Sequence, residues 1–187
     1  MRGPLLSLLA LTLLAASGAR ADGLVNGSLE PPAPFTGSQA VVPGAPKIPG
    51  WEVTGAGVHW TCGTFTFGAA DGIAFVDVAG GGLRQVFATR PGETYDLRFA
   101  ILASPDAELR VSVAGASAQV SGTDGPAPPG WEPRSLRFVA PGRSVTLAFD
   151  ASGVRAGALL LDRIGVSAGA STAAGAPTWG GLKLRYR

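Results

Sequence analysis

The feature that most constrains the fold is a two-residue alternation of apolar side chains. In residues 94–102 the apolar side chains fall at every second position, at Tyr95, Leu97, Phe99 and Ile101. Because successive side chains of a β-strand point to opposite faces, this spacing predicts a strand with one buried and one exposed face. Similar patterns predict strands over residues 73–78, 83–87, 109–113, 136–138, 145–149 and 159–166. Almost no segment shows the 3.6-residue period of an amphipathic helix, so we predict an all-β chain.

Residues that favour turns separate these segments at intervals of about ten residues, at 91–92, 104–106, 122–130 and 141–142. Such spacing is typical of an antiparallel sandwich or barrel in which each strand buries one face. We therefore predict an antiparallel β-sandwich. The proline-rich residues 31–49 are expected to form a long surface loop, and Gly80, Gly81 and Gly82 a hairpin turn.

The first 21 residues have the pattern of a secretory signal peptide. Arg2 precedes an apolar run over residues 5–16, and Ala19-Arg20-Ala21 supplies the small-x-small cleavage sequence. The run is too short to cross a hydrocarbon core of about 30 Å as a helix, so we expect no transmembrane anchor here. We expect cleavage after Ala21 and export of a chain that starts at Asp22. Its destination is then extracellular, the cell surface or the periplasm.

Residues 22–168 are enough for one domain with its own core. Residues 169–177 are small and are predicted to be a flexible linker, and residues 178–187 form a basic, aromatic tail. The tail fits either a disordered end or a sorting or docking signal. Net charge is only +2, and the small excess of arginine is spread along the chain, so we expect no nucleic-acid partner. The sequence leaves the oligomeric state open.

No catalytic constellation stands out. His59 is the only histidine and lies three residues from Cys62, the only cysteine. On a strand that spacing places the two side chains on opposite faces, which disfavours a nucleophile and base pair. No two carboxylates show the pairing that glycoside hydrolysis needs, and zinc and phosphate-loop signatures are absent. We therefore predict a protein that is not an enzyme.

Aromatic side chains are the candidate ligand-binding residues, because an aromatic face can stack on the apolar face of a sugar ring. Trp60, Phe65 and Phe67 flank a glycine-rich loop, and Trp131 follows the loop of residues 122–130. Burial in the core is the alternative for each of them. Trp51, beside Pro49 and Gly50, is expected in the core.

Several motifs, in this order, resemble the bacterial choice-of-anchor C family, which is related to the plant cell-wall family called domain of unknown function 642. They are NGSLE at 26–30, IPGWEVT at 48–54, VHW at 58–60, AADG at 69–72, VDV at 76–78, GLRQVFAT at 82–89, PGETY at 91–95 and ALLLDRIGV at 158–166. The likeness covers residues 24–167. It departs from the family at His59, where aspartate is usual, and at Arg163, which replaces an asparagine.

The resemblance implies a galactose-binding-like jelly roll, export, and contact with carbohydrate or a cell-surface polymer. It implies no established catalytic residues. In a jelly roll of this type the first and last strands lie side by side, which would bring Glu30 and Asp162 together. Many carbohydrate-binding modules of this fold hold a structural calcium at similar positions, and two carboxylates with backbone carbonyls suit that ion. Backbone amides, or arginines such as Arg163, are the alternative partners of both carboxylates.

Our leading hypothesis is thus a secreted, non-catalytic module that binds carbohydrate or a cell-wall polymer. The alternative is a structural surface or matrix protein that binds another protein, and a polysaccharide-active enzyme is third. An exposed aromatic shelf at Trp60, Phe65 and Phe67 would favour sugar binding, and its burial would favour the structural role.

Overall fold

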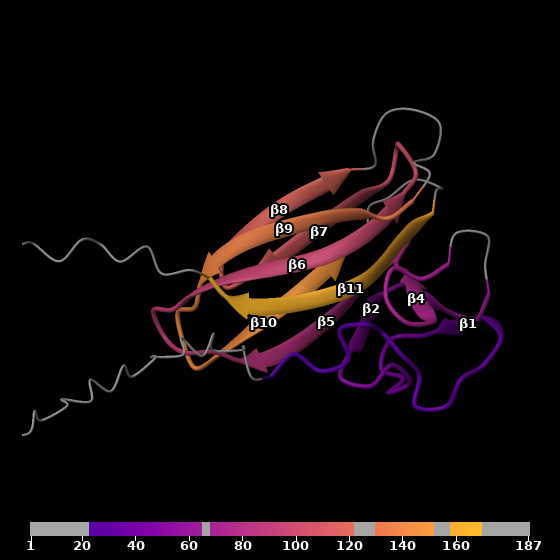
Figure 1. Cartoon of the computed structure of the whole chain (residues 1–187), viewed down its shortest axis with the longest axis horizontal. Helices are drawn as coiled ribbons and strands as arrows, with labels where there is room; N and C mark the ends of the chain where they lie inside the picture. The colour runs from indigo at the N-terminus through magenta and orange to yellow at the C-terminus, as the bar shows by residue number, and fades with distance from the viewer. Residues whose placement is uncertain (1–22, 65–67, 122–129, 152–157, 170–187) are drawn as a thin grey trace, which may run out of the picture.

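The computed structural model describes residues 23–64, 68–121, 130–151 and 158–169, which fold into two sheets packed face to face (Figure 1). The predicted signal peptide and tail lie outside the described residues, as does the predicted linker apart from Gly169. The strands are β1 (Gly37–Val41), β2 (Glu52–Gly55), β3 (Val58–Cys62), β4 (Ala74–Asp77), β5 (Gly81–Ala88), β6 (Thr94–Ala103), β7 (Glu108–Val113), β8 (Ala116–Ser121), β9 (Glu132–Val139), β10 (Ser144–Asp150) and β11 (Leu159–Ala168).

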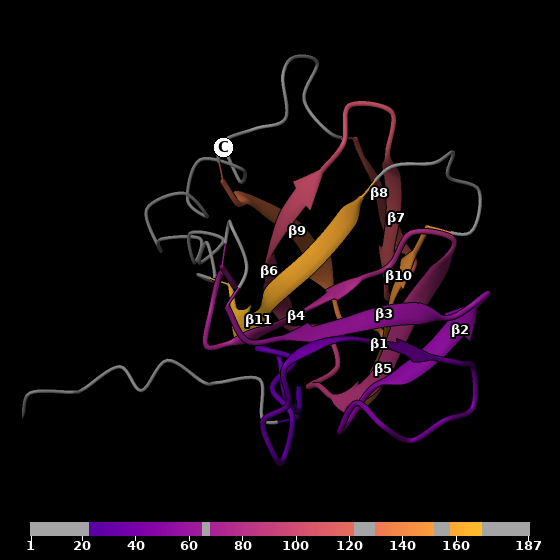
Figure 2. The ribbon, with the colours of Figure 1, turned by 90° about the vertical axis from the view of Figure 1, so that its right-hand side faces the viewer.

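One sheet has six strands in the order β1-β3-β4-β11-β6-β9, and the other has five in the order β2-β5-β10-β7-β8 (Figure 2). All strand pairs are antiparallel, and the described part of the chain contains no helix. A search of these residues for a helix long and apolar enough to span a membrane finds none. The predicted all-β, antiparallel jelly-roll sandwich is confirmed.

The strands predicted from alternation are all present, whereas the prediction of a continuous surface loop over residues 31–49 is wrong. β1 lies within that range and pairs with β3, which places Val41 opposite Val58. Only Val41 of β1 is buried. The strand therefore carries almost none of the apolar alternation that predicts seven of the other strands, and β2, β3 and β8 are not predicted either.

The glycine run at residues 80–82 is not a hairpin turn, because β4 belongs to the six-stranded sheet and β5 to the five-stranded sheet. The run connects a strand of one sheet to a strand of the other. A hydrogen bond of 2.9 Å from the Gly81 amide to the Val78 carbonyl closes this connection. A Cβ on Gly81 would lie 1.9 Å from the carbonyl oxygen of Gly57. Glycine is therefore required here by the close approach of two backbones.

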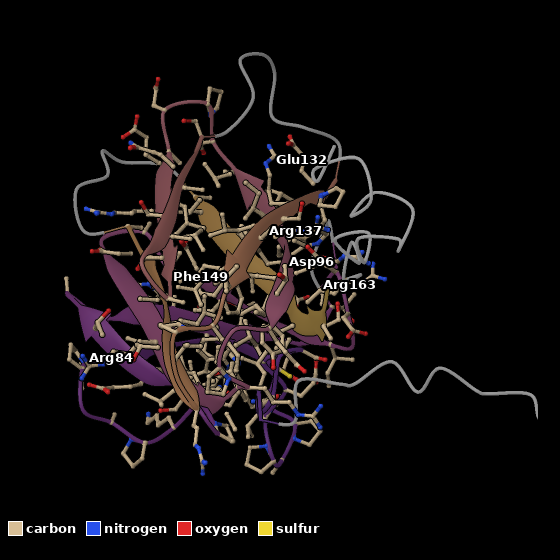
Figure 3. All side chains as sticks on the ribbon, turned by 90° about the vertical axis from the view of Figure 1, so that its left-hand side faces the viewer. Arg84, Asp96, Glu132, Arg137, Phe149 and Arg163 are labelled. Atoms are coloured by element: carbon tan, nitrogen blue, oxygen red, sulfur yellow. The ribbon has the colours of Figure 1, made fainter. Side chains whose placement is uncertain are left out.

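The core lies between the two sheets. Tyr95, Leu97, Phe99 and Ile101 are all buried there, as the alternation in β6 predicts. Phe99 reaches across the sandwich to Phe149 of β10, in an edge-to-face contact with ring centroids 5.3 Å apart. Figure 3 shows the position of Phe149. Such a contact adds to the free energy gained from burying both rings.

Replacing Phe99 with alanine should lower the free energy of unfolding by about 3–5 kcal/mol, because the change removes a buried ring and leaves a cavity. Val139→Ala is the control, since Val139 is 57% exposed at the end of β9. Its cost should stay within about 0.5 kcal/mol, the scale of surface substitutions. Urea denaturation of both variants makes the comparison. Equal costs would mean that Phe99 does not pack in the core.

Candidate functional site

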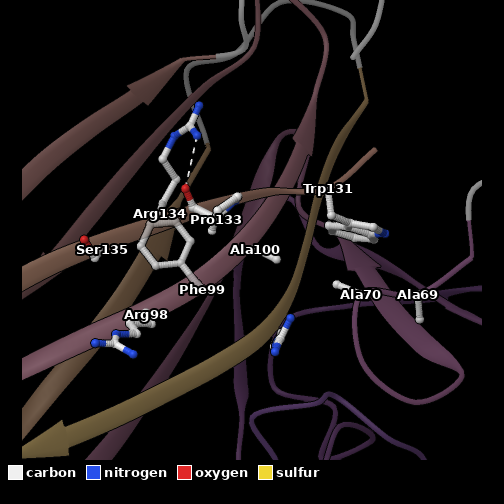
Figure 4. Close-up of a pocket in the computed structure, with 10 residues that line it drawn as sticks. Ala69, Ala70, Arg98, Phe99, Ala100, Trp131, Pro133, Arg134 and Ser135 are labelled. Atoms are coloured by element: carbon white, nitrogen blue, oxygen red, sulfur yellow. Dashed lines mark hydrogen bonds between the residues drawn. The ribbon is translucent and has the colours of Figure 1, made fainter. Parts of the chain in front are cut away.

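A pocket of about 760 Å³ opens over β6 and β9 of the six-stranded sheet (Figure 4). It is lined by Ala69, Ala70, Arg98, Phe99, Ala100, Trp131, Pro133, Arg134, Ser135 and Arg163. One of these, Trp131, is among the ligand-binding residues predicted from the sequence.

Residues that pair across three adjacent strands form the floor of the pocket. Ala100 of β6 pairs with Pro133 of β9 and with Asp162 of β11, and Arg98 pairs with Ser135. Residues paired directly across antiparallel strands share a face of the sheet. These residues alternate with the core residues of β6, so they face outward. The small side chains at Ala100, Pro133 and Ser135 leave the space above them open.

Trp131 forms one wall of the pocket and is fixed at two points. Its indole Nε1 donates a hydrogen bond of 3.0 Å to the carbonyl oxygen of Gly68. Its ring meets the ring of Phe75 edge to face, with centroids 5.8 Å apart. Phe75, Leu102 and Leu160 form a small apolar cluster against which Trp131 packs. Trp131 itself is half-buried, so part of the ring remains accessible.

Asp162 holds the loop at Ala69 and Ala70 against the sheet. Its Oδ2 accepts hydrogen bonds from the amides of Ala70 (2.7 Å) and Asp71 (2.9 Å), and its Oδ1 accepts one from the amide of Arg163 (2.6 Å). The carboxyl is completely buried. Burial raises the pKa of Asp162 to about 7; the three amide donors act in the opposite direction, and the charge of Asp71 adds to the rise.

Glu30 holds the other end of the same loop. Its Oε1 accepts hydrogen bonds from the amides of Ile73 (2.8 Å) and Ala74 (3.0 Å). The expectation that Glu30 ends a first strand next to the last one is wrong, because Glu30 follows a turn and β11 lies between β4 and β6. The turn does touch β11, since the Ile164 amide donates to the carbonyl oxygen of Gly27 at 2.8 Å.

The contacts of Glu30 and Asp162 match the alternative in which backbone amides satisfy both carboxylates. Amide N–H groups carry a positive partial charge, so carboxylate oxygens that face them are poorly placed for a cation. Calcium takes six to eight oxygen ligands. The described residues contain no group of three or more His, Cys, Asp or Glu side chains that could hold a metal ion. Calcium at these two residues stays a prediction, and the observed contacts do not favour it.

Two arginines add charge to the pocket. Arg163 lies in a β-bulge between Asp162 and Gly165 and has a φ of +52°. This left-handed conformation is uncommon for residues other than glycine, asparagine and aspartate, and a bulge of this kind re-aims a side chain. Arg98 lies on β6, opposite Ser135. Within the described parts of the chain, neither side chain donates a hydrogen bond or joins an ion pair.

The other nominated aromatics do not join Trp131. An exposed Trp60 is a wrong expectation, because its side chain is 4% exposed in the core, where Nε1 donates to the Leu29 carbonyl at 2.8 Å and the ring meets Phe35. Phe65 and Phe67 lie outside the described residues. Trp51 is in the core, as expected. Sequence reasoning missed Arg163 as a pocket residue, because the bulge that exposes it has no signal in the alternation.

Solved structures with a similar fold include an apo cyclase from Fischerella sp., with a TM-score of 0.58 at 13% identity, covering 83% of this chain and 98% of that chain. A second, from Fischerella sp. TAU in complex with (3Z)-3-(1-methyl-2-pyrrolidinylidene)-3H-indole, has a TM-score of 0.56 at 12% identity and covers 79% and 97%. The module TmCBM61 in complex with β-1,4-galactotriose has a TM-score of 0.50 at 16% identity and covers 64% and 88%. Identities this low show a shared fold.

No curated protein matches the sequence. The family model described as "Protein of unknown function (DUF642)" matches residues 22–165.

The buried Asp162 should make stability depend on pH. With a pKa near 7 in the folded state and about 4 when unfolded, the folded protein binds the extra proton between these values. The contribution of Asp162 is therefore full below about pH 4 and is lost as the pH rises to about 7. The unfolding free energy of the wild type should fall, relative to that of Asp162→Asn, by a few kcal/mol over this range. Urea denaturation at pH 4, 5.5 and 7.5 measures the difference, and parallel pH profiles would contradict it.

Proposed function

This chain belongs to the DUF642 family of proteins of unknown function, and we propose that it is an exported, non-catalytic module that binds carbohydrate in the pocket over β6 and β9. The single observation that carries this proposal is the position of Trp131. The indole is held at the pocket wall by Gly68 and Phe75, beside an open floor of small side chains. A ring fixed in this way can stack on a sugar without the entropic cost of ordering it first.

The size and position of the pocket support this function. Small-ligand sites commonly enclose about 300–1,000 Å³ and combine an apolar surface with a few polar groups. Here the apolar part comes from Trp131 and the alanines, and the polar part from Ser135 and the arginines. The floor belongs to three hydrogen-bonded strands, which keep these groups in a fixed arrangement.

The lining of the pocket supports a role without catalysis. It contains no Asp, Glu, His or Cys, whereas glycoside hydrolysis uses a pair of carboxyl groups and nucleophilic catalysis needs a base. Asp162 lies beneath the pocket, completely buried and bound by three amides. His59 is exposed on β3, while Cys62 is buried.

Neighbours in fold include both a sugar-binding module and enzymes. TmCBM61 was solved with β-1,4-galactotriose, which gives a precedent for sugar binding on this fold. The cyclases from Fischerella sp. show that the same fold also serves enzymes. The fold therefore does not separate the two roles, and our proposal depends on the lining of the pocket.

The motifs that resemble the choice-of-anchor C family support a partner at the cell surface, such as a cell-wall polymer. The burial of Trp60 favours a second candidate, a structural surface protein that binds another protein, because it removes one member of the expected aromatic shelf. Carbohydrate binding that depends on Trp131 separates these two candidates.

Replacing Trp131 with alanine should weaken carbohydrate binding at least tenfold, because the stacking surface is lost. A glycan array followed by affinity electrophoresis on the bound polymers measures this. Val139→Ala, at the far end of the strand β9 that follows Trp131 and 57% exposed, is the control and should bind as the wild type does. A wild type that binds no glycan, or a Trp131→Ala variant that binds normally, would overturn the proposal. Thermal unfolding should first confirm that both variants fold.

Export is tested separately. Expression of the full chain in a secreting host should yield a mature protein that begins at Asp22, as measured by intact-mass spectrometry. Substituting Ala21 with a bulky residue should block cleavage, since the processing site needs a small side chain. A released protein that retains Met1 would refute the signal peptide.

A further inference from the structure

The polar side chains of the pocket are nearly all hydrogen-bond donors. Its lining contains three arginines and Ser135, together with an indole N–H that is already bound to Gly68. Asparagine, glutamine, aspartate and glutamate are absent from the lining. A neutral sugar offers hydroxyl groups that both donate and accept, so its site needs acceptors as well as donors. Of the lining side chains, only Ser135 offers an acceptor.

Two of the three arginines form no hydrogen bond or ion pair with the described residues. Arg134 pairs with Glu132, whereas Arg98 and Arg163 make no such contact. Asp96 is two residues from Arg98 on the same face, but its two oxygens accept bonds of 2.7 and 3.1 Å from Arg137. Asp162, which precedes Arg163, faces three backbone amides. The hydrogen bonds of Asp96 therefore go to Arg137 and are the main cause of its lowered pKa, to which Arg98 contributes only through its charge, and those of Asp162 go to the backbone.

The backbone at Arg163 is a second sign of function. Its left-handed conformation is strained for an arginine, and glycine or asparagine would adopt it with less strain. Strained backbone that carries a polar side chain into a pocket is typical of functional sites. A charged side chain is thus held at the pocket at some expense of stability.

We propose that the saccharide bound in this pocket is anionic, and that Arg98 and Arg163 bind the carboxylate of a uronic acid residue while Trp131 stacks on its ring. The planar guanidinium fork matches the two oxygens of a carboxylate, and such charge-assisted bonds are short and strong. This inference rests on the proposed carbohydrate-binding function and names the class of its ligand.

The test uses the full mature chain and three trisaccharides of equal length. They are tri-galacturonate, its methyl ester, and neutral galactotriose. Isothermal titration calorimetry should show that the wild type binds tri-galacturonate at least tenfold more tightly than the other two. Raising sodium chloride from 50 to 500 mM should weaken this binding, because the salt screens the charges.

The variants Arg98→Gln and Arg163→Asn should each weaken binding of tri-galacturonate about tenfold and leave the methyl ester nearly unaffected. Arg163→Asn should also keep or raise the melting temperature, since asparagine tolerates the left-handed conformation. Arg110→Gln is the matched control, because it removes the same charge from β7 in the other sheet. It should bind as the wild type does.

The outcomes separate this inference from the proposed function. Equal binding of the three trisaccharides, with no effect of Arg98→Gln and Arg163→Asn, would overturn the anionic ligand and leave carbohydrate binding intact. A preference for dextran sulfate over tri-galacturonate would contradict the proposal that the bound group is a carboxylate. A wild type that binds no saccharide at all would refute the proposed function itself.

Discussion

The structure depends on the turn at residues 26–30, which the side chain of Asn26 holds closed. Asn26 has a φ of +52°, its Oδ1 accepts a bond from the Glu30 amide at 2.8 Å, and its Nδ2 donates to the carbonyls of Glu30 and Pro49. Carbonyls of the closed turn then accept the indole N–H groups of Trp51 and Trp60, at 2.9 and 2.8 Å. One asparagine therefore fixes the acceptors of two buried tryptophans, which would otherwise leave polar groups unpaired in the core.

The same turn positions the pocket. The carbonyl of Gly27 accepts the amide of Ile164 within the bulge, and a Cβ on Gly27 would lie only 1.9 Å from the Ile164 carbonyl oxygen. The contact needs glycine and holds β11 where the bulge presents Arg163. At the end of the turn, Glu30 binds the amides of the loop that continues from the pocket wall. The turn at residues 26–30 thus holds both the loop at the pocket wall and the bulge that carries Arg163, which makes the site rigid.

The sequence predicts strands such as β6, in which one face is buried and the other is exposed to solvent, because apolar and polar residues then alternate. It does not locate β1, whose single buried side chain leaves no pattern, and it does not locate β2, β3 or β8. It also cannot assign strands to sheets: Gly80 looks like a hairpin residue, but it joins two strands of different sheets.

The site is harder to predict for the same reason. Trp60 and Trp131 both neighbour loops rich in glycine. Trp60 points inward from β3, whereas Trp131, just before β9, lines the pocket, and the sequence pattern does not separate the two cases. The alternation does place Arg98 on the outer face. The alternation does not place Arg163 correctly, because a bulge shifts the register of β11 there and the side-chain pattern does not predict the bulge.

The pocket is positively charged because the neighbouring carboxylates form structural contacts elsewhere in the fold. Asp162 and Glu30 bind backbone amides, and Asp96 binds Arg137, so each is occupied by a structural contact. The sequence contains nearly as many acidic as basic residues, 13 against 15, and composition alone does not indicate an anion site. The charge appears because the acidic groups nearby stabilise loops and strand pairs, while Arg98 and Arg163 form no hydrogen bond or ion pair with the described residues. A site for an anion can thus arise on a nearly neutral chain, when folding satisfies the negative charges first.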